Sequence, residues 1–274
     1  MCEVRLVLFE EVCVFITNRC NLTCDYCYRI NSTNDFMTQE VFERVLSKLI
    51  DFDVKQINIT GGESLLHPKW REYIKCAHEM NFQVILSTNG LLLNLDDPIL
   101  NYIDVLAIGL DGSCEEIDSK FRGMNHFSIV NDIIQKYKKK KYNFSLKINT
   151  VLTKENYDDI ENMIPIVLGD NIFWRVFFCK FKGDYNSLSN DKAVSRDDYL
   201  NKVKALNKLM PEAFMLKSCL EDSTLDRVYT LINADGMLFV SRGEKDFLIG
   251  DYVSLSVNEL ISKINNTDFS IKKH

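Results

Sequence analysis

Short apolar runs rich in β-branched residues alternate, from residue 12 to about residue 182, with segments in which apolar residues recur at a helical period. The short runs predict strands of a buried parallel sheet. They cover residues 12–17, 56–60, 83–87, 105–110, 145–152 and 173–181. Helices are predicted between them: one that Thr38 caps, one that Pro68 opens and that runs to about Met80, one whose basic end covers 131–141, and one over 156–167.

Six strand-then-helix units predict a parallel sheet with right-handed crossovers. Six units suit an open barrel, so the expected fold class is α/β: a partial (β/α)6 TIM-like barrel with a C-terminal α+β extension. Polar residues and glycines come just after several predicted strands, among them Asn89 and Asp111. Because sites in parallel barrels are built at the C-terminal ends of the strands, we expect these residues at the functional edge.

Beyond residue 182 the pattern changes. Residues 183–200 are polar and typical of a connecting loop, and residues 199–209 follow a helical period. Residues 231–240, interrupted by Asp235-Gly236, predict a β-hairpin. We therefore divide the chain into a barrel core, residues 1–182, and a C-terminal extension, residues 183–274, that closes the substrate pocket.

Composition and charge narrow the class of protein. The 274 residues are 46% hydrophobic, enough for one large core with an appended subdomain. The 33 basic and 39 acidic residues give a net charge of −6, which argues against a protein that coats nucleic acid. No apolar stretch reaches the ~20 residues of a membrane span, and the N-terminus lacks a signal-peptide pattern. Nine cysteines then fit a reducing cytoplasm. We expect a cytoplasmic monomer without nucleic-acid or membrane partners.

Three cysteines, Cys20, Cys24 and Cys27, follow the first predicted strand in a C-x3-C-x2-C spacing. Three thiolates can hold three irons of a cubane iron–sulfur cluster and leave the fourth iron open. A structural zinc site would want four protein ligands, and no second CxxC completes one. A disulfide is disfavoured because three is an odd number and the chain has an intracellular composition. Three unrelated buried cysteines remain the plain alternative.

The cysteine triplet, the aromatic Tyr28 after it, and Gly61-Gly62-Glu63 at the end of the next strand resemble the radical S-adenosylmethionine (SAM) superfamily. The resemblance implies a [4Fe-4S] cluster with three cysteine ligands, whose open iron binds the amino and carboxyl groups of SAM. Reductive cleavage of SAM yields a 5′-deoxyadenosyl radical that takes a hydrogen atom from the substrate. The resemblance also implies an electron donor such as flavodoxin or ferredoxin.

Carried over by position, the resemblance assigns SAM contacts along the edge of the barrel. They are Gly61, Gly62, Glu63, Ser87, Asn89, Asp111 and Arg122. The glycine pair lacks Cβ atoms, so backbone can approach the methionyl amino group. An arginine can pair with the SAM carboxylate through two hydrogen bonds. The proline that usually follows the glutamate is Ser64 here. A turn-only role for the glycines and a surface salt bridge for Arg122 are the alternatives.

Later strands carry a second set of motifs. Lys147, Asn149 and Val151 form a K-x-N-x-V pattern, and residues 174–177 read W-R-V-F. With residues 229–232, 241–245 and 250–251, and with His126 after Arg122-Gly123, they resemble the viperin-like radical SAM enzymes. That resemblance implies dehydration of a nucleoside triphosphate to a 3′-deoxy-3′,4′-didehydro nucleotide, after abstraction of the ribose 4′ hydrogen. It implies a role in antiviral, anti-phage defence through chain termination.

A triphosphate carries about four negative charges, so an acidic protein must gather cations in one place. The candidates for phosphate contact are Lys147, Arg175, Arg242 and Lys245, and those for ribose or phosphate oxygens are Asn149 and Thr60. Two positions depart from the viperin-like pattern. Phe173 stands where that group has a phosphate-binding arginine, and Gln56 stands where it has a lysine.

Two other functions stay open from the sequence. One is a radical SAM enzyme that modifies a peptide or a carbohydrate, which a small precursor peptide encoded beside the gene would favour. The other is a non-catalytic iron–sulfur or SAM-binding sensor, which would cleave no SAM under strong reduction.

Overall fold

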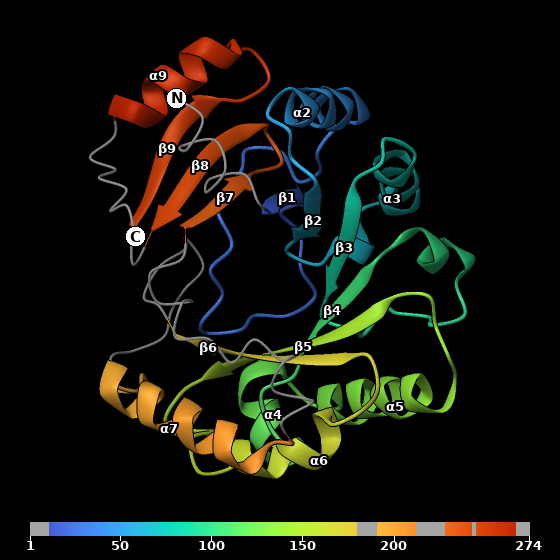
Figure 1. Ribbon diagram of the computed structural model, residues 1–274, viewed down its shortest axis with the longest axis vertical. Helices are drawn as coiled ribbons and strands as arrows, with labels where there is room; N and C mark the ends of the chain where they lie inside the picture. Colours follow the sequence, from blue (N-terminus) through green and yellow to red (C-terminus); the bar gives the residue numbers. More distant parts are fainter. Residues whose placement is uncertain (1–10, 180–190, 212–227, 243–244, 267–274) are drawn as a thin grey trace.

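The computed structural model describes residues 11–179, 191–211, 228–242 and 245–266, and the strands in these ranges form one curved sheet (Figure 1). Its order is β6-β5-β4-β3-β2-β1-β7-β8-β9. The parallel strands are β1 (Glu11–Thr17), β2 (Gln56–Gly61), β3 (Gln83–Thr88), β4 (Val105–Gly109), β5 (Ser145–Leu152) and β6 (Ile172–Phe178). The expected α/β fold, a partial TIM-like barrel, is confirmed.

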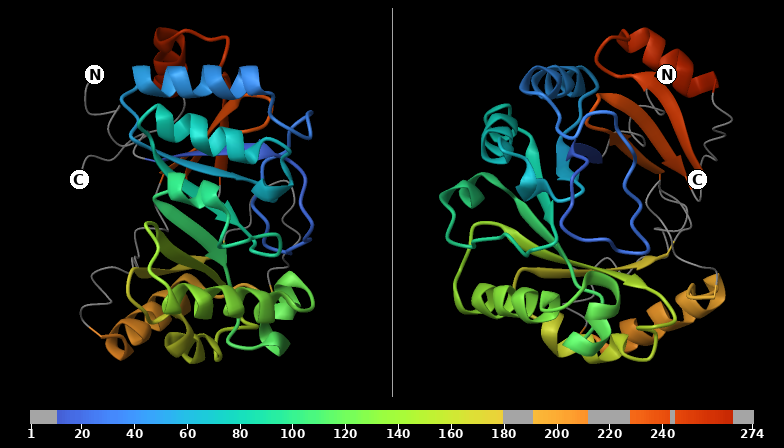
Figure 2. Two further views of the ribbon diagram at one scale, coloured as in Figure 1. Left: turned by 90° about the vertical axis from the view of Figure 1, so that its right-hand side faces the viewer. Right: turned by 180° about the vertical axis from the view of Figure 1, so that it is seen from behind.

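The helices lie around the outside of the curved sheet in Figures 1 and 2. They are α2 (Gln39–Asp51), α3 (Trp70–Glu79), α4 (Glu115–Arg122), α5 (His126–Lys139), α6 (Ile164–Val167), α7 (Arg196–Leu209) and α9 (Val257–Asn266), with short 3-10 turns at Ser64–Leu66, Pro98–Tyr102 and Ile160–Met163. Their apolar faces and the outward side chains of the strands form the core.

Alternation along the strands decides what faces the interior of the barrel. In β5 the buried residues are Leu146, Ile148, Thr150 and Leu152, and the residues between them are half-buried. Successive side chains of a strand point to opposite faces, so Lys147, Asn149 and Val151 share the inner, concave face. The outer face joins the helices, and the inner face is left for a ligand.

The local predictions hold in most places and fail in three. Thr38 caps α2 by accepting a hydrogen bond from the Val41 amide, as expected. The helix after Pro68 begins later, at Trp70. The helix expected over 156–167 is wrong: this stretch holds only the turn Ile160–Met163 and the short α6. Pro165, which lacks an N–H, breaks it. The third miss is α4, which the sequence pattern did not reveal and which carries Arg122.

The C-terminal extension continues the sheet of the core. Strand β7 (Val228–Ile232) pairs parallel with β1, and β8 (Met237–Arg242) and β9 (Lys245–Asp251) follow antiparallel. The predicted hairpin turn at Asp235-Gly236 is confirmed, with Gly236 at a φ of +80°. In the described residues, no helix is long and apolar enough to cross a membrane.

Two polar contacts fasten this extension to the core. The Asp235 carboxylate accepts hydrogen bonds from the backbone and side chains of Thr33 and Asn34, in the loop that follows the cysteines. The Lys48 ammonium group of α2 donates to three backbone oxygens between residues 252 and 255. The strands of the extension therefore have a defined position beside β1.

Candidate functional site

A cavity of about 340 Å³ lies inside the curve of the sheet, and its lining comes from strands β1 to β7 and the loops at their C-terminal ends. Among the residues proposed from the sequence, those that line it are Cys20, Cys24, Cys27, Thr60, Gly61, Gly62, Ser87, Asn89, Arg122, Lys147, Asn149 and Arg175. Glu63 and Asp111 are buried behind the lining. Lys245 is exposed and outside it, and for Arg242 only the backbone is described.

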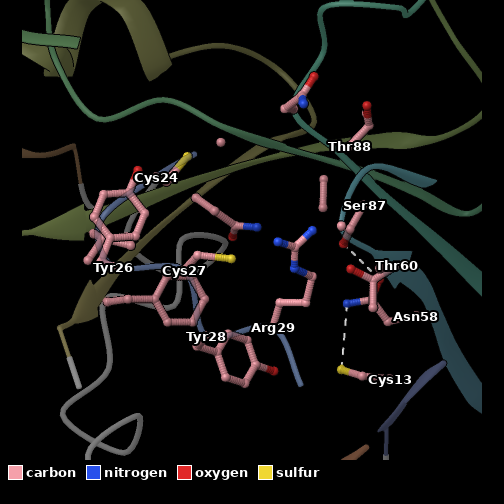
Figure 3. A pocket seen from close by; sticks show the side chains of 18 of the residues that line it. Cys13, Cys24, Tyr26, Cys27, Tyr28, Arg29, Asn58, Thr60, Ser87 and Thr88 are labelled. Atoms are coloured by element: carbon pink, nitrogen blue, oxygen red, sulfur yellow. Dashed lines mark hydrogen bonds between the residues drawn. The ribbon is translucent and has the colours of Figure 1, made fainter. Parts of the chain in front are cut away.

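The three cysteines of the motif open onto this cavity from one loop. Figure 3 shows the Cys27 sulfur directed toward the Arg29 side chain and the Cys24 sulfur farther from it, near Tyr26. The loop is tightened by a Cys27 amide that donates to the Cys24 oxygen (3.1 Å), and the Leu22 amide donates to the Cys20 sulfur (3.4 Å). None of the three cysteines is in a disulfide. All three thiols are therefore available to one ligand.

The donor set fits an iron–sulfur cluster better than a single metal ion. Over the described ranges, no three His, Cys, Asp or Glu side chains converge as they would around one ion. Around a cubane cluster, each of three thiolates binds a different iron, so the sulfurs stay apart. The fourth position is left to an exogenous ligand. These residues suit a [4Fe-4S] cluster with one open iron.

Burial raises the pKa of two of these thiols, Cys20 and Cys24. It raises the pKa of Cys24 to about 11, although the nearby Arg122 acts in the opposite direction. Burial also raises the pKa of Cys20, against the hydrogen bond from the Leu22 amide. A coordinating metal deprotonates a thiol. Metal binding by Cys20 and Cys24 would therefore release protons.

The glycine pair after β2 lies where backbone from two other segments approaches closely. A Cβ on Gly62 would overlap the backbone oxygen of Arg19, and a Cβ on Gly61 would overlap that of Thr17. The Gly62 amide donates to the Thr17 oxygen (2.8 Å), and the Glu63 amide donates to the Arg19 oxygen (2.8 Å). This turn is thus packed against the start of the cysteine loop, and both glycines face the cavity.

Glu63 stabilises the turns behind the cavity. It is 1% exposed, and its carboxylate accepts hydrogen bonds from the Leu65 amide (3.0 Å), the Thr88 hydroxyl (2.7 Å) and the Asn89 amide (2.6 Å). Burial raises its pKa, and the bond from the Asn89 amide opposes that shift most strongly. The carboxylate therefore joins the turn after β2 to the turn after β3, while the Asn89 side chain faces the cavity.

Asp111 has the same role after β4. Its buried carboxylate accepts hydrogen bonds from the Tyr26 hydroxyl, from Nε of Arg122 and from the Val151 amide. A Cβ on Gly109 would overlap the Arg122 guanidinium group, so that group lies directly on the glycine in the cavity wall. Asp111 fixes Arg122 from behind and leaves its terminal nitrogens at the cavity.

The opposite wall is formed by β5 and β6. Asn149 lies beside Arg175 in the register, and Lys147 lies two residues earlier on β5. The Asn149 Oδ1 and the Arg175 Nε are buried and have no hydrogen-bond partner within the described part of the chain. Buried polar atoms are nearly always paired in a complete complex. This wall is suited to a polar or anionic ligand.

Several lining residues were not among those proposed from the sequence. Asn58 accepts a hydrogen bond from the Ser87 hydroxyl (2.7 Å), and Arg29 and Tyr229 also line the cavity. Tyr28, the aromatic residue noted after the cysteines, lines it as well. Figure 3 shows Asn58 and Ser87 side by side on neighbouring strands. Asn58 lies two residues before Thr60 on β2, so strand alternation could have identified it.

The sequence profile of the radical SAM superfamily matches residues 14–164. An S-adenosylmethionine-dependent nucleotide dehydratase from Fibrobacter sp. (strain UWH6) is 24% identical over 91% of this chain and 83% of its own length. A GTP 3′,8-cyclase from Staphylococcus epidermidis is 28% identical over 74% of this chain, which spans 64% of that relative. A nucleotide dehydratase from Danio rerio is 26% identical over 72% of this chain and 60% of its own length.

Two solved structures share the fold at low sequence identity. The enzyme anSMEcpe, with bound AdoMet and a peptide, has a TM-score of 0.70 at 18% identity, over 92% of this chain and 79% of its own. SuiB from Streptococcus suis, bound to S-adenosylmethionine, has a TM-score of 0.68 at 16% identity, over 85% of this chain and 60% of its own. Both support the open-barrel architecture.

Proposed function

This chain belongs to the radical SAM superfamily, and we propose that it is a viperin-like nucleotide dehydratase. Its substrate would be a nucleoside triphosphate and its product a 3′-deoxy-3′,4′-didehydro nucleotide. A [4Fe-4S] cluster on Cys20, Cys24 and Cys27 and a bound SAM would supply a 5′-deoxyadenosyl radical. The similarity to two nucleotide dehydratases, one of them over most of this chain, supports the proposal.

The protein's own contribution is to hold two ligands in one enclosed space. In this proposal the edge after β2, β3 and β4 binds SAM, with Gly61 and Gly62 near its amino group and Arg122 near its carboxylate. The wall of β5 and β6 binds the nucleotide. The 4′ carbon must lie between these walls, because hydrogen transfer requires the reacting atoms to be close and aligned. Exclusion of water protects the radical from side reactions.

The nucleotide assignment rests on buried polar atoms of the β5–β6 wall that have no hydrogen-bond partner in the described residues. Lys147 and Arg175 bring two cations to the cavity, and the buried Asn149 Oδ1 and Arg175 Nε have no partner in the described residues. A phosphate accepts charge-assisted hydrogen bonds from arginine and lysine, and a ribose hydroxyl can donate to the Asn149 oxygen. Thr60 lines the same space and is proposed to contact ribose or phosphate.

We propose three phosphates for the substrate, although two cations that bind phosphate in the viperin-like pattern are replaced here by Phe173 and Gln56. Phe173 lies beside Lys147 in the register, and the Gln56 amide donates to Gln83 (3.4 Å). We propose that Arg242, on β8, supplies part of the missing positive charge. A didehydro nucleotide has no 3′ hydroxyl and would terminate chains, so an antiviral role in the cytoplasm belongs to the same proposal.

Loss of the 3′ hydroxyl as water from the 4′ radical needs one proton and one electron. The electron donor that reduces the cluster, such as flavodoxin or ferredoxin, would also supply this electron. Hydrogen abstraction itself leaves 5′-deoxyadenosine, which is therefore the natural product to follow.

The test is anaerobic, reduced enzyme with SAM and each nucleoside triphosphate in turn, with formation of 5′-deoxyadenosine as the measurement. One nucleotide should accelerate it and should lose the mass of one water. The mono- and diphosphates of the same nucleoside, run in parallel, measure the phosphate requirement. Formation of 5′-deoxyadenosine that ignores all the nucleotides would contradict the proposal and would favour a peptide or carbohydrate substrate. A protein that cleaves no SAM with an intact cluster would be a sensor.

The similarity to GTP 3′,8-cyclases favours a second candidate, cyclisation of GTP. The same assay separates the two reactions. A cyclised product keeps the mass of GTP, whereas a dehydrated product loses one water.

A further inference from the structure

His126 is the first residue of α5 and lies behind the cavity wall, with its side chain fully buried. Its Nε2 is 2.9 Å from the backbone oxygen of Asn89, and its Nδ1 is 2.5 Å from Oδ2 of Asp118. A carbonyl oxygen can only accept a hydrogen bond, so Nε2 donates. The second contact places a proton between Nδ1 and the carboxylate. The ring thus joins an acceptor in the loop after β3 to an acceptor on helix α4.

On one side the ring holds the loop after β3. The Asn89 amide donates to Glu63 Oε2 (2.6 Å), and the Asn89 oxygen accepts from His126, so the backbone of this residue is held at both polar groups. The Asn89 side chain lines the cavity and donates to Asn21 Oδ1 (2.7 Å) in the cysteine loop. His126 therefore helps to fix the orientation of Asn89 toward the cavity.

On the other side the ring holds the loop after β4 through Asp118, which is also fully buried. Asp118 Oδ1 accepts from the Asp111 amide (2.8 Å), and the Asp111 carboxylate accepts from Arg122. An unbroken chain of hydrogen bonds leads from Asn89 through His126, Asp118 and Asp111 to Arg122. Its two ends line the cavity, and the three residues between them do not.

We propose that His126 is a positioning residue for SAM: it sets the spacing between Asn89 and Arg122, so that both face the cofactor at once. His126 itself touches no ligand. The inference deepens the proposed function and rests on its SAM site, but not on the identity of the substrate. SAM binding without any nucleotide is therefore the quantity to measure.

The first variant is His126→Phe, which keeps a planar ring and removes both donors. Reconstituted holoenzyme should keep its iron content, while the Kd for SAM, measured by equilibrium dialysis, rises roughly tenfold, the scale of one lost charge-assisted hydrogen bond. The SAM concentration that shifts the electron paramagnetic resonance signal of the reduced cluster should rise by a similar factor.

The second variant, Asp118→Asn, separates the hydrogen bonds from the charge. The amide oxygen can still accept from the Asp111 amide, and the amide nitrogen can donate to Nδ1 of a neutral ring whose Nε2 still donates to Asn89. This variant should bind SAM within about twofold of the wild type. Asp118→Leu removes both contacts and should weaken SAM binding as His126→Phe does.

The matched control is His67→Phe. His67 is 2% exposed, its Nε2 is 3.0 Å from the Met37 oxygen and its Nδ1 accepts from the Lys69 amide (3.0 Å), away from the cavity. Its loss should lower the melting temperature without changing the Kd for SAM.

An unchanged Kd for SAM in His126→Phe would overturn the proposal, as would an equal rise in His67→Phe. If His126→Phe does not fold, a tenfold loss of SAM affinity in Asp118→Asn would overturn it instead. An enzyme that binds SAM as described but ignores every nucleotide would contradict only the dehydratase assignment.

Discussion

The two walls of the cavity differ in how completely their polar groups are paired. Behind the edge after β2, β3 and β4, the carboxylates of Glu63 and Asp111 each accept three hydrogen bonds from the protein. On the β5–β6 wall, Asn149 Oδ1 and Arg175 Nε are buried without a partner in the described residues. The two carboxylates behind the first wall are paired before any ligand arrives. The two atoms on the second wall are left for a ligand to pair.

The cysteine loop should give the largest effect. Cys24→Ala removes one of three proposed cluster ligands and leaves a second iron of the cluster without a protein thiolate. We expect loss of the brown iron–sulfur absorbance and of all SAM cleavage, with the far-ultraviolet circular dichroism retained. Cys76→Ala is the control, because Cys76 lies on α3 outside the cavity. If the Cys24→Ala protein kept its iron and its activity, the cluster would not be bound by this loop.

The preformed wall should be the more sensitive of the two to loss of a charge. Asp111→Asn leaves the Arg122 guanidinium, whose side chain is 11% exposed, without its buried carboxylate. Breaking a buried ion pair costs about 3 kcal/mol in the free energy of unfolding. The surface pair of Lys136 and Asp132, both more than half exposed, is the comparison, and Asp132→Asn should cost at most about 1 kcal/mol. Urea denaturation measures the free energy of unfolding of both variants. Equal losses of stability would show that the buried pair contributes no more than the surface pair.

Substitutions on the β5–β6 wall should spare stability and SAM binding. Arg175→Met and Lys147→Ala each remove one cation from the proposed phosphate site, so the Kd for the nucleotide should rise about tenfold, as for one charge-assisted hydrogen bond. The Kd for SAM and the iron content should not change. Arg71→Met on the outer helix α3 is the control. If both cavity variants bound the nucleotide as tightly as the wild type, the phosphates would not bind at Lys147 and Arg175.

The smallest effect concerns Asp235, which fastens the extension to the cysteine loop. Burial alone would raise the pKa of Asp235, but the hydrogen bonds from Thr33 and Asn34 outweigh it and lower the pKa below its usual value. A lowered carboxyl pKa stabilises the fold above the unfolded value and loses that contribution as the pH falls through the folded value.

The corresponding variant is Asp235→Asn, which should be roughly 1 kcal/mol less stable than the wild type at neutral pH. The difference should shrink on acidification below about pH 4, where the unfolded carboxyl also takes up a proton. Urea denaturation at a series of pH values measures it. A difference that stays constant down to pH 3 would show that the charge of Asp235 contributes nothing.

The sequence predicted the elements whose signals are local. Each parallel strand is a short apolar run, and the alternation in β5 was enough to place Lys147 and Asn149 on one face. The spacing of the cysteines predicted the loop after β1. The glycine pair predicted a place where another backbone segment approaches closely, and the structure shows this approach. These features depend on neighbours along the chain, so a single sequence can reveal them.

The sequence could not predict contacts between residues that are far apart along the chain. Glu63 and Asp111 follow strands just as Asn89 does, and nothing local says that their carboxylates turn away from the cavity. Asp111 does so because Tyr26, 85 residues earlier, donates to it. The bond from His126 to Asn89 spans 37 residues. The short helix α4 was missed because its polar residues outweigh its two buried positions.

We propose that the wall after β2, β3 and β4 holds SAM and that the β5–β6 wall holds a nucleotide, with the ribose 4′ carbon between them. The most direct test uses a nucleoside triphosphate carrying deuterium at the 4′ position, incubated with SAM and anaerobically reduced enzyme. Mass spectrometry of the 5′-deoxyadenosine should show one deuterium for each nucleotide dehydrated. Abundant 5′-deoxyadenosine without deuterium, whichever nucleotide is supplied, would show that the radical does not abstract the ribose 4′ hydrogen.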